Sequence, residues 1–134
     1  MAEDIPWERL FEEATRVRQR AHVPYSRFPV GAAVLYADGS VVAGCNVENA
    51  TYGLTVCAER GAFAAGVAQG RASPVAVAIV VDTPEPCPPC GMCRQVMAEF
   101  ARPGLPVRSR NLKGDEARYS LAELLPHAFT RDFL

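Results

Sequence analysis

The segment "PVAVAIVVDT" (residues 74–83) is an almost continuous run of apolar residues, many of them β-branched. Such a run is typical of a central strand covered on both faces, because a strand with one solvated face alternates apolar and polar residues. Covering both faces requires packing partners on each side of the sheet. The run therefore predicts an α/β protein whose sheet lies between layers of helices.

A β-hairpin is predicted upstream of this strand. Residues 29–37 and 40–47 form two strand-like runs that are separated by Asp38-Gly39. Asp-Gly is a strong hairpin signal, because the tight turn between the strands needs positive φ angles. Between the hairpin and the central strand, a helix is expected from about residue 56 to 69. It is apolar on almost every face, which predicts packing against both the sheet and another subunit.

An amphipathic helix is predicted near the N-terminus. We expect Pro24 to end it, since proline lacks the amide donor and disfavours helix in the residue before it. Its apolar positions follow a helical spacing: Trp7, Leu10, Phe11, Ala14, Val17 and Ala21.

Downstream of the central strand, a helix is expected over about 92–101. Strands follow at 105–110 and 117–120, and a short helix at 121–125. This order predicts a three-layer α/β/α sandwich on a mixed sheet of about five strands. At 134 residues, the whole chain (1–134) is expected to form a single domain.

Composition narrows the function classes. The formal charge of −1 gives no long-range attraction to nucleic acid, and no apolar stretch is long enough for a membrane span. The N-terminal stretch "MAEDIPWERL" is acidic, so we do not expect a secretion signal. Five cysteines without an export signal suggest a reducing compartment, where clustered thiols bind metal more often than they form disulfides. We therefore predict a cytoplasmic protein.

Three cysteines are candidates for one zinc site. Cys57 lies at the start of one predicted helix, and Cys90 and Cys93 lie at the start of another. Helix N-termini favour thiolates, and helices on one side of a sheet can bring these ends together. Three thiolates leave the fourth position of a tetrahedral zinc open, as in catalytic sites. Glu59 would then be available as the general base.

A fourth thiol, Cys87, leaves two alternatives open. Pro88-Pro89 hold the chain extended after it, so it is expected to be a spare thiol. If it joined the other three, the zinc site would be closed and structural, and the protein would not be an enzyme. "CPPC" (87–90) could instead be a thiol–disulfide pair at a helix start.

The first ligand two positions before glutamate, followed by P-C-x-x-C, matches the pattern of zinc nucleobase deaminases. Beyond that pattern, five segments resemble the short, homotetrameric cytidine deaminases in order and spacing over nearly the whole chain. They are "YSRFPVGAAV" (25–34), "NVEN" (46–49), "CAER" (57–60), "PCGMCRQVMAEF" (89–100) and "ELLPHAF" (123–129).

This resemblance implies a reaction. Cytidine and 2′-deoxycytidine would be hydrolysed to uridine and 2′-deoxyuridine plus ammonia, as in pyrimidine salvage. One Zn²⁺ per chain would be held by Cys57, Cys90 and Cys93, and zinc-bound hydroxide would attack C4 of the base. Glu59 would shuttle the proton, and Arg60 would offset the negative charge of the thiolates.

The resemblance also implies how the nucleoside is held. Asn46 and Glu48 would bind the ribose hydroxyls, Phe28 would pack against the base, and the Ala58 backbone N–H would hold the base carbonyl. Phe129 would complete the active site of a neighbouring subunit in a homotetramer. No contact with nucleic acid or membrane is implied.

The nearest rival within this chemistry is an aminonucleoside-antibiotic deaminase of the blasticidin type. "NVEN" argues against it, since ribose recognition needs those two polar side chains. Deaminases of nucleotides or nucleic acids usually have histidine as first ligand and need a basic surface for phosphate, whereas this chain has Cys57 and no basic cluster in its sequence.

Overall fold

The apolar run at 74–83 forms β3 (Pro74–Val81), the middle strand of a five-stranded sheet with the order β2-β1-β3-β4-β5. On one side it pairs antiparallel with β1 (Val30–Tyr36), which pairs with β2 (Val41–Cys45) as the predicted hairpin. On the other side it pairs parallel with β4 (Pro106–Asn111), whose outer neighbour is the antiparallel β5 (Glu116–Ser120). The prediction of a mixed sheet is confirmed.

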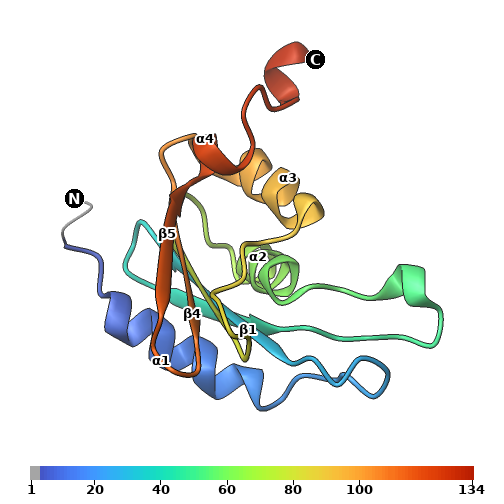
Figure 1. Cartoon of the computed structure of the whole chain (residues 1–134). Coiled ribbons are helices and arrows are strands. Elements are labelled where there is room, and N and C mark those ends of the chain that lie inside the picture. The colour runs from blue at the N-terminus through green and yellow to red at the C-terminus, as the bar shows by residue number, and fades with distance from the viewer. Residues whose placement is uncertain (1–3) are drawn as a thin grey trace.

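Helices cover both faces of this sheet in the computed structural model, which describes residues 4–134 (Figure 1). Residues 1–3, the start of the acidic N-terminal stretch, lie outside the described part. One face packs against α1 (Trp7–Arg18), and the other against α2 (Ala58–Ala68), α3 (Gly91–Phe100) and the short α4 (Leu121–Leu124). The predicted three-layer sandwich is confirmed. None of the helices in residues 4–134 has the length and apolar character that crossing a membrane requires.

Glycines allow two of the helices to approach the sheet closely. A Cβ at Gly44 in β2 would lie 2.5 Å from the Ala62 nitrogen and 2.6 Å from the Ala58 carbonyl oxygen. A Cβ at Gly31 in β1 would lie 1.9 Å from the Ala14 carbonyl oxygen of α1. Only a residue without a side chain fits at these two crossings, so α2 is seated directly against the strand that precedes it.

The prediction that Pro24 ends the first helix was wrong, because α1 already ends at Arg18. The following residues turn away and pair with the chain beyond β2. The His22 amide donates to the Asn46 carbonyl, and the Glu48 amide donates to the His22 carbonyl. This long-range pairing, which local periodicity does not reveal, overrides the helical pattern.

The described chain does not bury α2 on all sides, contrary to its apolar sequence. Ala64, Val67 and Ala68 are exposed, and Val67 keeps 54% of its surface accessible. A second subunit over this face remains a prediction.

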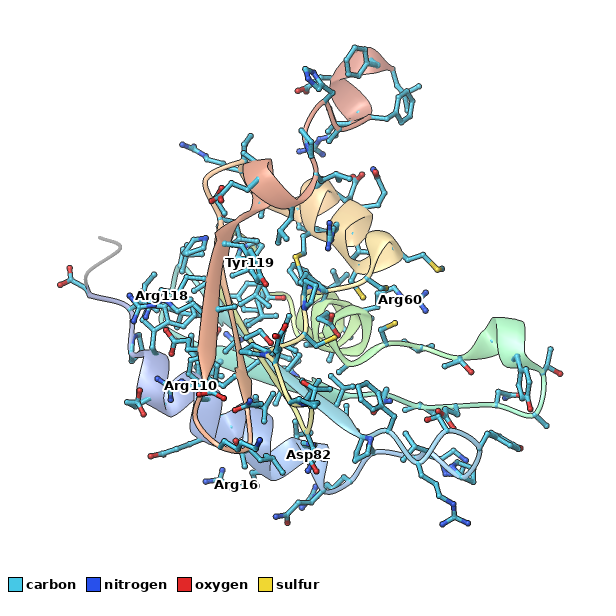
Figure 2. All side chains as sticks on the ribbon, in the orientation of Figure 1. Arg16, Arg60, Asp82, Arg110, Arg118 and Tyr119 are labelled. Carbon is cyan, nitrogen blue, oxygen red and sulfur yellow. The ribbon has the colours of Figure 1, made fainter. Side chains whose placement is uncertain are left out.

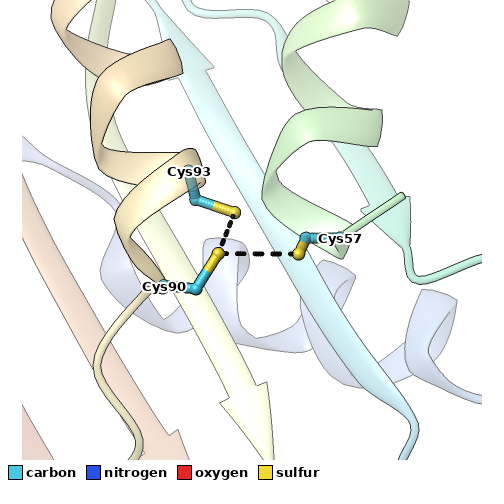
Figure 3. A group of neighbouring side chains, drawn as sticks. All are labelled: Cys57, Cys90 and Cys93. Carbon is cyan, nitrogen blue, oxygen red and sulfur yellow. Dashed lines mark hydrogen bonds between the residues drawn. The ribbon is translucent and has the colours of Figure 1, made fainter. Parts of the chain in front are cut away.

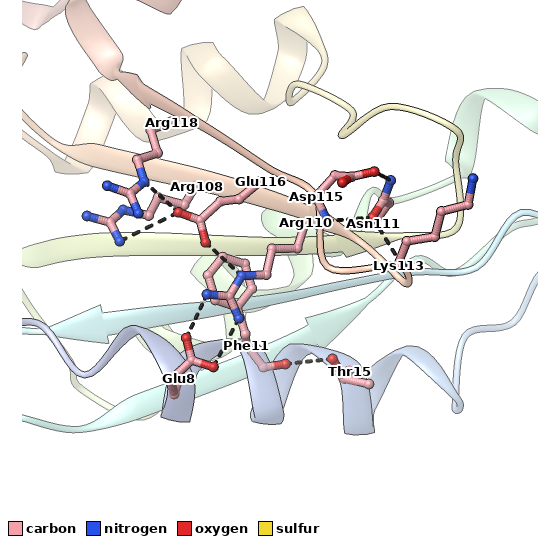
Figure 4. Close-up of polar contacts among 10 residues, drawn as sticks. All are labelled: Glu8, Phe11, Thr15, Arg108, Arg110, Asn111, Lys113, Asp115, Glu116 and Arg118. Carbon is pink, nitrogen blue, oxygen red and sulfur yellow. Dashed lines mark hydrogen bonds and ion pairs between the residues drawn. The ribbon is translucent and has the colours of Figure 1, made fainter.

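The structure also gathers three arginines from β4 and β5 into a network with two carboxylates. Arg108 and Arg110 on β4 lie beside Arg118 on β5 (Figure 4). Glu116 contacts all three, at 3.7, 2.7 and 2.5 Å, and Glu8 on α1 contacts Arg110 at 2.6 Å. Two carboxylates therefore neutralise most of this charge and join α1 to the edge of the sheet.

Candidate active site

Two helix N-termini meet beside the sheet and bring three thiols together (Figure 3). Cys57 is the N-cap residue of α2, and Cys90 is the N-cap residue of α3, with Cys93 in the first turn. The Sγ atoms of Cys57 and Cys90 are 3.7 Å apart, and those of Cys90 and Cys93 are 3.4 Å apart. All three lie within 4.8 Å of one another, so the predicted convergence is confirmed.

These sulfur positions fit a zinc ion. Tetrahedral zinc with Zn–S bonds of about 2.3 Å holds its sulfurs roughly 3.8 Å apart. The spacings of 3.7 and 3.4 Å are close to this value before any adjustment. Three cysteines supply three of four tetrahedral positions, which is the donor number of a catalytic zinc site.

Without a cation, the three thiols do not ionise together. The largest effect on the pKa of Cys57 is a hydrogen bond from Cys93, which lowers it. Smaller contributions from Cys90 and Arg60 act in the same direction. Together they outweigh burial and lower the pKa of Cys57 to about 5. The pKa of Cys93 is raised in turn, first by that same hydrogen bond and then by burial. Adjacent thiols cannot all ionise unless a positive charge lies between them. A divalent metal would supply that charge.

Glu59 is buried in the first turn of α2, with 5% of its surface exposed. Burial raises the pKa of its carboxyl group, and the charge of Cys57 adds to this effect, while a hydrogen bond with Cys93 opposes it. A carboxyl group with a raised pKa next to a metal site is suited to take up a proton and release it again.

Arg60 lies on the α2 side of the sheet, away from α1 (Figure 2). Its Nη2 donates to the Thr55 carbonyl at 2.8 Å, which holds the guanidinium against the segment before Cys57. Its charge and hydrogen bonding lower the pKa of Cys57. The buried Nε has no hydrogen-bond partner among residues 4–134.

Cys87 lies outside the group of three. Its thiol donates to the Pro88 carbonyl at 3.5 Å and packs against the hydrophobic core. Burial raises its pKa, as does the nearby charge of Glu59. The thiol is therefore not among the three grouped sulfurs, and its role as a spare cysteine remains a prediction.

Asn46 is buried just after β2 and holds the segment that contains Phe28. Its Nδ2 donates to the Phe28 carbonyl, and its Oδ1 accepts from the Val30 amide, both at 2.8 Å. An amide side chain offers two N–H groups and two lone pairs on oxygen, so one of each is left for a ligand. Phe28 itself is 39% exposed.

Glu48 is partly buried, and its carboxylate faces the same segment. Oε1 accepts from the amides of Tyr25 and Ser26 at 3.0 and 3.1 Å, and Oε2 accepts from the Ser26 hydroxyl. The Ser26 hydroxyl is the main cause of a lowered pKa at Glu48. A cavity of about 420 Å³ lies here, lined by Tyr25, Ser26, Glu48, Tyr52 and Thr55.

The structure does not bring Phe129 to the thiols of its own chain. Phe129 is 61% exposed, stacks on Phe133 at 5.8 Å between ring centroids, and accepts from Gln95 through its carbonyl. The C-terminal segment extends away from the sheet beyond α4 (Figure 1). A contact with a neighbouring subunit remains a prediction.

The structure adds two residues, Ser26 and Arg94, to the surroundings of the site. The Arg94 Nε donates to the Pro89 carbonyl, directly before Cys90, and its Nη1 donates to the Leu124 carbonyl, both at 2.8 Å. Its position one turn after Cys90 was a usable signal, but the partner at residue 124 was not visible in the sequence. Ser26 lies in the segment 25–34, but its partner Glu48 is 22 residues away in the sequence.

Comparison with known proteins gives the family. The cytidine and deoxycytidylate deaminase zinc-binding region matches residues 6–107. The cytidine deaminase of Halalkalibacterium halodurans is 54% identical over 92% of this chain and 93% of that protein. That of Sporosarcina psychrophila is 50% identical over 95% of this chain and 93% of its own.

Solved structures agree with this result. A crystal structure of cytidine deaminase from Burkholderia pseudomallei matches with a TM-score of 0.90 and 46% identity, covering 93% of this chain and 100% of that one. The cytidine deaminase structure from Mycobacterium tuberculosis matches with a TM-score of 0.80 and 42% identity, over 94% and 98% of the two chains. With a family match over most of its length and relatives at 50–54% identity, this chain belongs to the cytidine and deoxycytidylate deaminase family.

Proposed function

We propose that this protein is a zinc-dependent cytidine deaminase. It would hydrolyse cytidine and 2′-deoxycytidine to uridine and 2′-deoxyuridine, with one water consumed and one ammonia released. The observation that carries the proposal is the group of three thiols at two helix N-termini next to a buried carboxyl group. Relatives named cytidine deaminase, at 50–54% identity over almost the full chain, support the substrate class.

Cys57, Cys90 and Cys93 would hold the zinc. When bound, zinc acts as a Lewis acid and makes water nucleophilic at neutral pH. The two helix N-termini direct partial positive charge at the sulfurs and stabilise them as thiolates. The guanidinium of Arg60 reduces the remaining negative charge beside Cys57.

Glu59 would be the proton carrier. Its raised pKa matches a group that takes a proton from the attacking water and gives it to N3 of the base, and later to the departing ammonia. Its burial excludes bulk water, which would otherwise compete for the proton. The amide of Ala58, at the start of the same helix, would donate to the base carbonyl.

Asn46 would donate to and accept from the ribose hydroxyls, Glu48 would accept from them, and Phe28 would pack against the base. This set favours a nucleoside over an aminonucleoside antibiotic, because it provides polar groups for a ribose. The exposed face of α2 and the extended C-terminal segment support a homotetramer in which Phe129 completes a neighbouring site. A cytoplasmic location and a place in pyrimidine salvage follow from the same proposal.

The test measures zinc and turnover together. The purified protein should contain about one zinc per chain and change the ultraviolet absorbance of cytidine as uridine forms. Glu59→Gln should keep the zinc but lower kcat by roughly 10²–10⁴-fold, because the carboxyl group carries a proton and is not a ligand. Glu12→Gln, the same change at an exposed position of α1, is the control. Substantial turnover by the Glu59 variant would contradict the mechanism.

A further inference from the structure

We infer that Ser26 is a positioning residue that orients the Glu48 carboxylate toward the ribose and links it to the segment that contacts the base. The inference rests on the proposed function and adds to it a residue that contacts neither the metal nor the reacting atoms. It comes from a chain of hydrogen bonds between two loops that are distant in sequence.

The Ser26 hydroxyl joins two residues of the proposed nucleoside site. It donates to Oε2 of Glu48 and accepts from the Phe28 amide at 3.0 Å. A hydroxyl that accepts one hydrogen bond becomes a better donor for the next. The orientation of Glu48 is therefore tied to the backbone position of Phe28.

The two carboxylate oxygens of Glu48 have different surroundings. Oε1 accepts from two backbone amides, at 3.0 and 3.1 Å, which no side-chain substitution removes. Oε2 is held by the Ser26 hydroxyl. Each carboxylate oxygen has about two lone-pair sites, so Oε2 keeps one site for a ribose hydroxyl. Ser26 thus fixes the carboxylate plane while leaving an acceptor for the ligand.

Asn46 holds the other end of the same segment, between Phe28 and Val30. The Ser26 bridge and the Asn46 bridge flank Phe28, so the groups proposed for ribose and base share one rigid unit. The cavity of about 420 Å³ beside Ser26 and Glu48 gives a ligand access to Oε2.

The test compares two substrates that differ only in ribose hydroxyls. For Ser26→Ala, kcat/KM for cytidine should fall by roughly 5–30-fold, mostly through KM, because a charged acceptor loses the donor that orients it. For 2′,3′-dideoxycytidine, which offers no hydroxyl to Glu48, the fall should be less than about twofold. Ser26→Thr, which keeps the hydroxyl, should restore discrimination between the two substrates.

The hairpin turn offers a matched control. The Ser40 hydroxyl donates to Asp38 Oδ1 at 2.6 Å and its amide donates to the same oxygen at 2.9 Å, so Ser40→Ala removes a similar contact far from the thiols. This control should leave both kcat/KM values unchanged. In a Glu48→Ala background, Ser26→Ala should not change the ratio of kcat/KM for cytidine to kcat/KM for 2′,3′-dideoxycytidine any further.

An equal loss for both substrates would make the role of Ser26 merely structural and overturn the inference. Unchanged kinetics for Ser26→Ala would do the same, while leaving the proposed function intact as long as the wild-type protein converts cytidine. A wild-type protein that binds zinc but does not convert cytidine would overturn the proposed function itself.

Discussion

Replacing Gly44 by alanine tests whether the contact between β2 and α2 sets the spacing of the metal-binding thiols. The new Cβ would lie 2.5 Å from the Ala62 nitrogen and 2.6 Å from the Ala58 carbonyl oxygen. Both are backbone atoms of a helix and cannot rotate away. Restoring an ordinary contact of 3.4 Å requires α2 to move by roughly 0.9 Å from β2.

That movement would displace Cys57, the N-cap of α2, relative to Cys90 on α3. The two sulfurs are 3.7 Å apart, and metal–ligand distances tolerate only about 0.2 Å of error. We therefore expect about 1–3 kcal/mol of destabilisation from overpacking. Zinc affinity should also fall by roughly 10–100-fold, because a support of the metal ligands has moved.

Urea unfolding and competition with a chromogenic zinc chelator measure the two effects. Gly61→Ala is the matched control, because its Cβ would lie at an ordinary 3.6 Å from the Cys45 carbonyl oxygen in the same α2–β2 contact. Alanine within a helix is favoured over glycine by up to about 1 kcal/mol, so this variant should be as stable as the wild type or more so. If Gly44→Ala unfolds and binds zinc as the wild type does, the packing argument is wrong.

Two further substitutions test the thiol count and the charge network. Cys87→Ser should leave zinc content and cytidine turnover unchanged, whereas loss of zinc would support a closed site with four thiolates. Burial raises the pKa of Glu116, but hydrogen bonds from Arg110 and Arg118 outweigh it and lower the pKa below 4.5. The ionised Glu116 carboxylate thus stabilises the fold above pH 4.5, and this stabilisation is lost as the pH falls through the pKa that Glu116 has in the folded protein. Glu116→Gln should therefore be less stable near neutral pH, with a difference that shrinks in acid; urea unfolding from about pH 3 to pH 7 measures it, and a constant difference would contradict the reasoning.

Features encoded by short-range patterns were predictable from the sequence. The unbroken apolar run of β3 indicated a covered central strand, and Asp38-Gly39 indicated the hairpin. The meeting of Cys57 with the other two thiols followed from cysteines at two helix starts on one side of a sheet. In each case, a local residue choice and a general packing rule were sufficient.

Features that depend on the register between distant segments were not predictable. The cluster around Glu116 exists because Arg108 lies directly opposite Arg118 in the β4–β5 pairing. The early end of α1 depends on the pairing of His22 with the chain beyond β2. The Ser26–Glu48 contact likewise joins two loops whose relative position only the folded chain defines.

The unequal exposure of the three sulfurs has a kinetic consequence. Cys93 is buried and Cys57 is half-buried, whereas Cys90 faces solvent. On a single chain, an incoming donor such as a chelator would reach Cys90 first, so Cys90 would be the first ligand released and the last one regained. Ligand exchange in this protein would then proceed in a fixed order, with the buried thiol retaining the ion longest.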